Sequence, residues 1–119
     1  MTLFDKYGGV PTVRMIVKAF YKDVLSRSHL QNYFNGVDMD RLIEHQIEFV
    51  AYALGKPKAE YSDESLREGH KDLGITSAHF DEVANILLSV LLHFNLERDD
   101  VNTICGVVDS KRHLIVEND

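Results

Sequence analysis

Histidine is the residue type that stands out in this sequence, with six in 119 residues. An imidazole can bind a metal and can change its charge near neutral pH. His70 shares one face of a short predicted helix, residues 66–73, with Leu66 and Leu73. Two helical turns are marginal by themselves because helix nucleation is costly. This segment is therefore expected to pack against something that also satisfies the imidazole.

Two other polar side chains fall on predicted apolar helix faces. Tyr21 lies in the apolar stripe that ends at residue 25, and Gln46 lies beside Leu42 and Phe49, with His45 at the edge of that face. Burying an unpaired amide costs about 1–3 kcal/mol, and a buried phenol also needs a partner. The two groups therefore indicate a shared ligand. A flat apolar cofactor with a central metal would supply that ligand and the surface that the short helix lacks.

The elements that position these residues are all predicted to be helices. Apolar residues recur at steps of three and four, and no segment shows sustained alternation, so we expect an all-α fold in a single domain, residues 1–119. Residues 56–65 are predicted to form a loop of a length that often serves a ligand. The helices are predicted over residues 11–25, from a cap at Asp38 or Asp40 to residue 54, and over residues 66–73, 77–94 and 99–110.

Composition excludes several classes of protein. The net charge of −6, with scattered Lys and Arg, argues against a nucleic-acid partner. The longest apolar run, residues 84–92, is about half the roughly 20 residues that a membrane-spanning helix needs. Cys105 is the single cysteine, and the first residues show no secretory signal, so we expect a cytoplasmic protein without an internal disulfide.

Several segments, taken in order and spacing, resemble the group I truncated haemoglobins. The match extends over nearly the whole chain and rests on short pieces that would each be weak evidence alone. These pieces are residues 3–9 (LFDKYGG), 19–25 (AFYKDVL), 33–34, 37–39, 45–46 with Phe49, 52–53, 66–73 (LREGHKDL) and 78–81 (AHFD).

The resemblance implies a two-over-two helical sandwich around haem b that reversibly binds O2, CO and NO. It places His70 at the proximal histidine that binds the haem iron, and Tyr21 at the distal tyrosine that donates a hydrogen bond to bound oxygen. Gln46 matches the distal glutamine that assists this tyrosine. The remaining matched positions are a distal one at Leu42, porphyrin contacts at Phe34, Phe49 and Leu66, and a tunnel-lining one at Val50.

His45 is the most informative variable position. Many members of the family carry Lys or Arg here and use it to reach a haem propionate, whereas cyanobacterial members carry a histidine that binds iron as a sixth ligand. We expect His45 to close the distal site until a gas displaces it, with propionate binding as the alternative. Ser110 occupies the position of the histidine that some members attach to a haem vinyl group. His113 lies three residues later, which puts covalent attachment in doubt.

The resemblance leaves the activity open. Conversion of nitric oxide to nitrate, or peroxidase-like chemistry, would both need an outside reductase as a partner. A monomer that binds neither nucleic acid nor membrane is expected. A different class, a helical phosphotransfer module with His45 or His70 as phospho-acceptor, is disfavoured because both histidines lie beside apolar faces and neither precedes Lys-Gly. A gas sensor would need an output domain that these residues do not contain.

Overall fold

The computed structural model describes residues 1–118 and confirms the predicted all-helical fold. Within these residues the only β-type pairing is an isolated bridge between Thr76 and Asn118, and none of the helices has both the length and the apolar character needed to cross a bilayer. The helices are α1 (Leu3–Lys6), α2 (Val10–Leu25), α3 (Ser28–Gln31), the 3-10 helix η1 (Asn32–Phe34), α4 (Met39–Ala53), α5 (Asp63–His70), α6 (Ser77–His93), α7 (Arg98–Asp109) and α8 (Arg112–Ile115).

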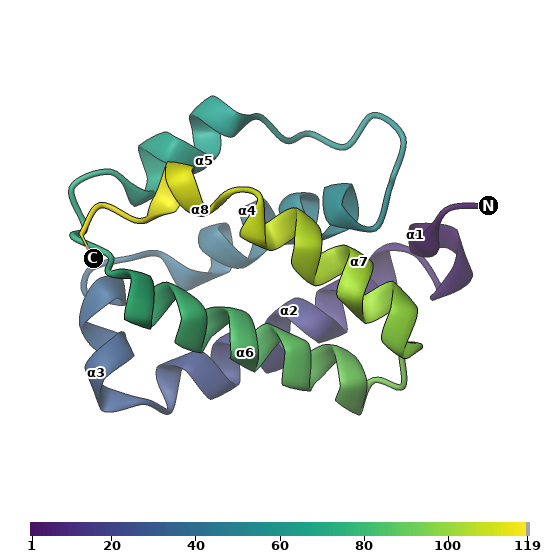
Figure 1. The fold of residues 1–119 in the computed structure, drawn as a ribbon, viewed down its shortest axis with the longest axis horizontal. Coiled ribbons are helices and arrows are strands. Elements are labelled where there is room, and N and C mark those ends of the chain that lie inside the picture. Colours follow the sequence, from purple (N-terminus) through teal and green to yellow (C-terminus); the bar gives the residue numbers. More distant parts are fainter. Residues whose placement is uncertain (119) are drawn as a thin grey trace.

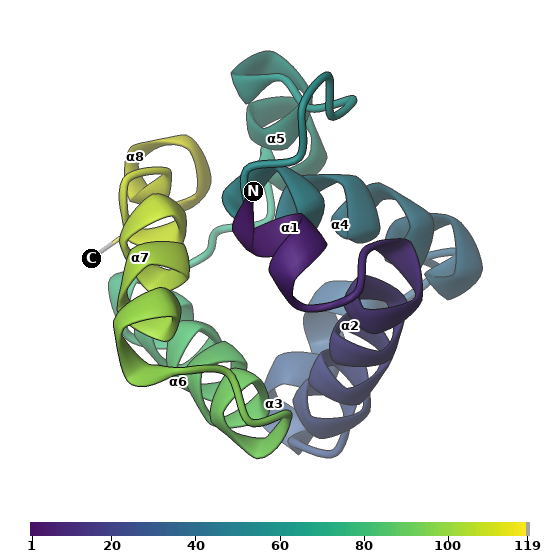
Figure 2. The ribbon, with the colours of Figure 1, turned by 90° about the vertical axis from the view of Figure 1, so that its right-hand side faces the viewer.

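Four long helices form the frame of the molecule. Helix α2 packs against α4 and α6, while α6 packs against α7. Figure 2 shows α6 and α7 as one wall, α2 and α4 as the other, and α5 above α4. The short helix α5 makes its main helix contacts with α8, so the C-terminal part of the chain supports it (Figure 1). This arrangement places α5 in contact with α8 and over α4.

Side-chain caps mark where α4, α5 and α6 begin. The carboxylate of Asp38 accepts a hydrogen bond from the backbone N–H of Arg41, which makes Asp38 the cap of α4. The hydroxyl of Thr76 caps α6 by accepting from the N–H of His79, so this helix starts at Ser77 as predicted. Ser62 caps α5.

The prediction for the short helix was displaced by three residues. It spans residues 63–70 rather than 66–73, because Ser62 provides a cap and the chain becomes extended at Lys71 directly after His70. The carboxylate of Glu117 then accepts hydrogen bonds from the backbone N–H groups of Asp72 and Gly74, at 3.0 and 2.8 Å. Leu73 therefore lies beyond the helix and is 41% exposed.

Helix α4 is buried on two faces, whereas the sequence predicted one. Ile47, which fell outside the predicted stripe, is packed in the main core with Val50 and Leu54. Phe49, on a different face of α4, contacts Leu66 and Leu114 in a second, smaller cluster under α5. A helix between a core and a cavity needs apolar residues on both sides, which a single-stripe pattern does not describe.

Replacing a core leucine tests the frame directly. Leu91 in α6 is fully buried and Leu92, its neighbour, is 37% exposed. We expect Leu91→Ala to lower the free energy of unfolding by about 2–5 kcal/mol, because it removes apolar contacts and leaves a cavity. Urea unfolding of both variants measures this. Leu92→Ala is the matched control, and equal losses in the two variants would contradict the packing described.

Candidate functional site

A single large cavity gathers the residues that the sequence singled out. Its volume is about 660 Å³, within the range of small-molecule and cofactor sites. It lies among α2, η1, α4, α5 and the first half of α6, and most of its lining is apolar. All eight predicted site residues line it: Tyr21, Phe34, Leu42, His45, Gln46, Phe49, Leu66 and His70, and so does Val50.

His70 is held with one ring nitrogen occupied and the other available. Its Nδ1 lies 2.7 Å from the backbone carbonyl oxygen of Leu66, one turn earlier in α5. A carbonyl can only accept, so Nδ1 carries the proton and Nε2 keeps its lone pair. Burial lowers the pKa of His70, and the hydrogen bond to Leu66 opposes this only in part. A neutral imidazole with its second nitrogen tied to a carbonyl is the form that binds metal ions.

Tyr21 and Gln46 bring unused hydrogen-bond donors to the same cavity. Tyr21 is 6% exposed, with its ring edge-on to Phe20 and Phe34 at centroid distances of 4.9 and 5.9 Å. Burial raises the pKa of Tyr21, so the phenol stays protonated and can donate. Within residues 1–118 neither the Tyr21 hydroxyl nor the Gln46 amide has a hydrogen-bond partner. A ligand that accepts hydrogen bonds would satisfy both donors.

His45 stands at the exposed edge of the cavity. It lies in α4 next to Gln46 and one turn after Leu42, and it is exposed while its ring still contributes to the lining. The fully charged side chains that join it there are Glu48, Glu60 and Glu68. Among the described residues neither Lys nor Arg lines the cavity. This position suits either of the two roles expected of His45.

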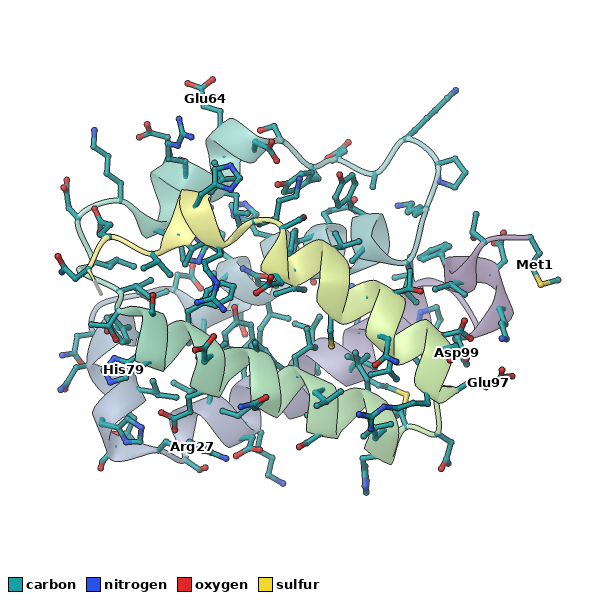
Figure 3. The ribbon with its side chains drawn as sticks, viewed as in Figure 1. Met1, Arg27, Glu64, His79, Glu97 and Asp99 are labelled. Carbon is teal, nitrogen blue, oxygen red and sulfur yellow. The ribbon has the colours of Figure 1, made fainter. Side chains whose placement is uncertain are left out.

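Tyr33 and His79 form a polar contact at the cavity that sequence reasoning missed. The Tyr33 hydroxyl and His79 Nδ1 are 2.7 Å apart, and both residues line the cavity. Behind them the carboxylate of Glu82 binds His29 at 2.7 Å and Arg27 at 2.9 Å. Figure 3 shows His79 and Arg27 at the same end of the molecule. No spacing rule links residues 46 positions apart, and only the fold brings them together.

His113 lies outside the main cavity. It is exposed in α8 and lines a second cavity of about 270 Å³ together with His70, Lys71 and Glu117. Ser110, which occupies the position of the attachable histidine in the sequence match, is the C-cap of α7. Glu68 and His70 line both cavities, whereas His113 lines only the smaller one.

The donor set fits a haem. A haem needs an apolar slot for its porphyrin, one neutral imidazole for its iron, and room for a ligand beside that iron. The apolar lining supplies the first, and His70, with Nδ1 engaged and Nε2 unpaired, supplies the second. The unpartnered donors of Tyr21 and Gln46 mark a place where a polar ligand would be stabilised.

The comparisons with known proteins agree with this fit. Residues 2–117 match the family described as bacterial-like globin. The group 1 truncated hemoglobin GlbN of Synechocystis sp. is 34% identical over 116 residues, covering 94% of this chain and 93% of that protein.

Solved structures of truncated globins superpose on nearly the whole chain. The 2/2 hemoglobin of Synechococcus sp. PCC 7002, in the cyanomet state and with covalently attached heme, has a TM-score of 0.88 and 30% identity, covering 98% of both chains. The Fe(III) form of truncated hemoglobin from Tetrahymena pyriformis has a TM-score of 0.88 and 26% identity, covering 99% of this chain and 100% of that one.

These findings favour a globin over the phosphotransfer module that the sequence left as an alternative. The family uses haem as its cofactor and binds small gaseous ligands such as O2 at it. The same elements that place His70 beside a large apolar cavity are the elements that superpose on the solved haem proteins. This chain belongs to the group 1 truncated haemoglobins of the bacterial-like globin family, with haem as its cofactor.

Proposed function

We propose that this protein reversibly binds dioxygen, and also CO and NO, at a b-type haem held by His70. The observation that carries the proposal is the state of that imidazole. Its Nδ1–H is committed to the carbonyl of Leu66, so its Nε2 has a fixed direction and no proton. Burial, which lowers the pKa of His70, keeps the ring neutral at physiological pH.

The haem would supply iron with a coordination position for the gas, and the protein would control what happens there. Bound dioxygen carries partial negative charge, which hydrogen-bond donors stabilise strongly in a cavity of low dielectric constant. The protonated hydroxyl of Tyr21 and the amide of Gln46 are donors with no competing partner among residues 1–118. The apolar walls around them keep water away. We therefore expect oxygen to dissociate slowly.

His45 is proposed as a displaceable sixth ligand of the iron. Its ring is at the edge of the cavity, on the same helix as Gln46 and without a hydrogen-bond partner in the described residues. The exposed His45 side chain can move without disrupting the core, because it makes little contribution to the packing of the fold. The state of His45 would then set how fast gases reach the iron.

Conversion of nitric oxide to nitrate is the second candidate activity. It would combine NO with bound dioxygen and would take one electron per turnover from an outside reductase. The supporting observation is the apolar lining that Val17, Val24 and Val50 give to the side of the cavity next to Tyr21. Apolar walls admit an uncharged diatomic gas, and the donor of Tyr21 would hold the dioxygen until that gas arrives.

Removal of the His70 imidazole tests the cofactor site. We expect His70→Gly to weaken haem binding more than roughly 100-fold, because changes to outer-shell groups alone cost 10- to 100-fold. The violet absorption band of the protein measures this, and free imidazole added to the variant should restore it. His93→Ala, an exposed histidine at the end of α6, is the control. A normal band in His70→Gly without imidazole would reject the assignment.

The role of His45 can be read from the spin state of the iron. The reduced, ligand-free protein should show sharp, split low-spin bands, and His45→Ala should convert them to a broad high-spin band. Because a ligand-occupied site is open for only a fraction of the time, CO should associate about 10- to 100-fold faster with the variant. High-spin bands in the unmodified protein would instead support propionate binding by His45. His113→Ala serves as the control.

The donor of Tyr21 should matter for oxygen and much less for carbon monoxide. Tyr21→Phe keeps the ring and removes the hydroxyl, so the contacts with Phe20 and Phe34 survive. A hydrogen bond to a charged acceptor contributes about 1.5–3 kcal/mol, which corresponds to roughly 10- to 100-fold faster oxygen dissociation. Stopped-flow measurement of both gases checks this. Equal effects on O2 and CO would show that the hydroxyl does not bind the ligand.

A further inference from the structure

Two stacked tyrosines connect the haem cavity with the protein surface. Tyr61, in the segment between α4 and α5, lines the cavity. Its ring stacks on that of Tyr52 in α4, with centroids 4.3 Å apart and planes inclined by 25°. Tyr52 is 38% exposed and does not line the cavity. The pair therefore has one ring beside the cofactor site and one ring in contact with solvent.

The carboxylate of Asp63 can accept the proton of the Tyr61 phenol. The Tyr61 hydroxyl donates a hydrogen bond to Asp63, and Lys111 forms an ion pair with the same carboxylate at 3.0 Å. Burial raises the pKa of Tyr61 to about 12, and the bond to Asp63 adds to this, so the phenol is protonated at neutral pH. Removing an electron from such a phenol makes it a strong acid, which Asp63 can deprotonate within the existing hydrogen bond.

This arrangement distinguishes Tyr52 and Tyr61 from the other tyrosines. In the part of the chain that the structure describes, theirs is the only stacking of two tyrosine rings. The aromatic neighbours of Tyr21 are phenylalanines, and the neighbour of Tyr33 is His79. Tyr7 bonds to Asp100 near the N-terminus, away from the cavity lining. Only Tyr52 and Tyr61 could join their rings without a change of fold.

We propose that Tyr52 and Tyr61 are a redox-active pair that reduces a peroxide at the haem and becomes cross-linked as dityrosine. Each phenol gives up one electron and one proton, and together these convert one hydrogen peroxide, with cleavage of its O–O bond, into two waters. The two ring carbons next to the hydroxyls then form a C–C bond. The hydrogens on those carbons move back to the oxygens, so the protein loses two hydrogen atoms in total.

The inference goes beyond gas binding and depends only on haem in the cavity. It does not require the proposed roles of His45 or Tyr21. The position of Tyr61 in a connecting segment rather than a helix allows its ring to tilt toward Tyr52 as the bond forms. Lys111 lies over both rings, with its Nζ 5.3 Å from the centroid of Tyr61 and 5.4 Å from that of Tyr52. Its ion pair with Asp63 keeps that carboxylate ionised before the oxidation, and therefore able to accept the phenol proton.

Mass spectrometry of the haem-loaded protein after treatment with one equivalent of hydrogen peroxide tests the proposal. Trypsin should release residues 42–58 and 59–67 as separate peptides, each with one tyrosine, because Lys56 precedes Pro57 and resists cleavage. After peroxide we expect these two peptides to be joined, with a combined mass lower by two hydrogens and with the blue fluorescence of dityrosine. The intact protein should remain a single chain.

Matched variants separate this pair from general oxidation. Tyr52→Phe should abolish the joined peptide, and Tyr33→Phe, which removes another cavity-lining hydroxyl, should leave its yield unchanged. Haem-free protein should give none. CO spectra of each variant show whether haem is bound and accessible. Absence of the joined peptide in unmodified protein with a normal CO spectrum would overturn the pair without affecting gas binding. Dityrosine found only between two chains would overturn it too.

Discussion

The hydrogen bond from His70 Nδ1 to the carbonyl of Leu66 is the interaction on which the site depends. It fixes the tautomer and the direction of the imidazole, and it exists only while α5 is a helix, since it spans one turn. A helix of eight residues is not stable alone. Ser62 caps its start, Leu66 packs against Phe49 and Leu114, and α8 supports its outer side. The orientation of the His70 imidazole is therefore set by tertiary contacts.

The C-terminal residues matter because they hold the segment that follows the histidine. Glu117 accepts from the backbone N–H groups of Asp72 and Gly74, and these bonds lower the pKa of Glu117. The backbone N–H groups of Glu117 and Asn118 bond in turn to the carbonyl of Ile75. Glu117 and Asn118 thus hold the segment between α5 and α6 by hydrogen bonds. These bonds fix the path of the chain shortly after His70.

On the side of the cavity formed by α2 and α4, in contrast, polar groups are left without hydrogen-bond partners. The Tyr21 hydroxyl and the Gln46 amide have no hydrogen-bond partner within residues 1–118, and both side chains line a cavity that is mainly apolar. Both groups therefore keep their hydrogen-bonding capacity for a molecule that enters the cavity. The residues that stabilise the fold are therefore distinct from those proposed to stabilise the ligand.

The long helices could be predicted from the sequence because their apolar periodicity is a local property of α2, α4, α6 and α7. The identity of the residues around the cavity also came from the sequence, through buried polar positions and an ordered set of short matches. The register of α5 did not. Its cap at Ser62 is local, but the turn that follows His70 is held by hydrogen bonds to Glu117, which is 45 positions from Asp72. The Tyr33 contact with His79 and the stacking of Tyr52 on Tyr61 were invisible for the same reason. Periodicity records which side of a helix is buried, while the packing of distant segments decides what each buried side touches.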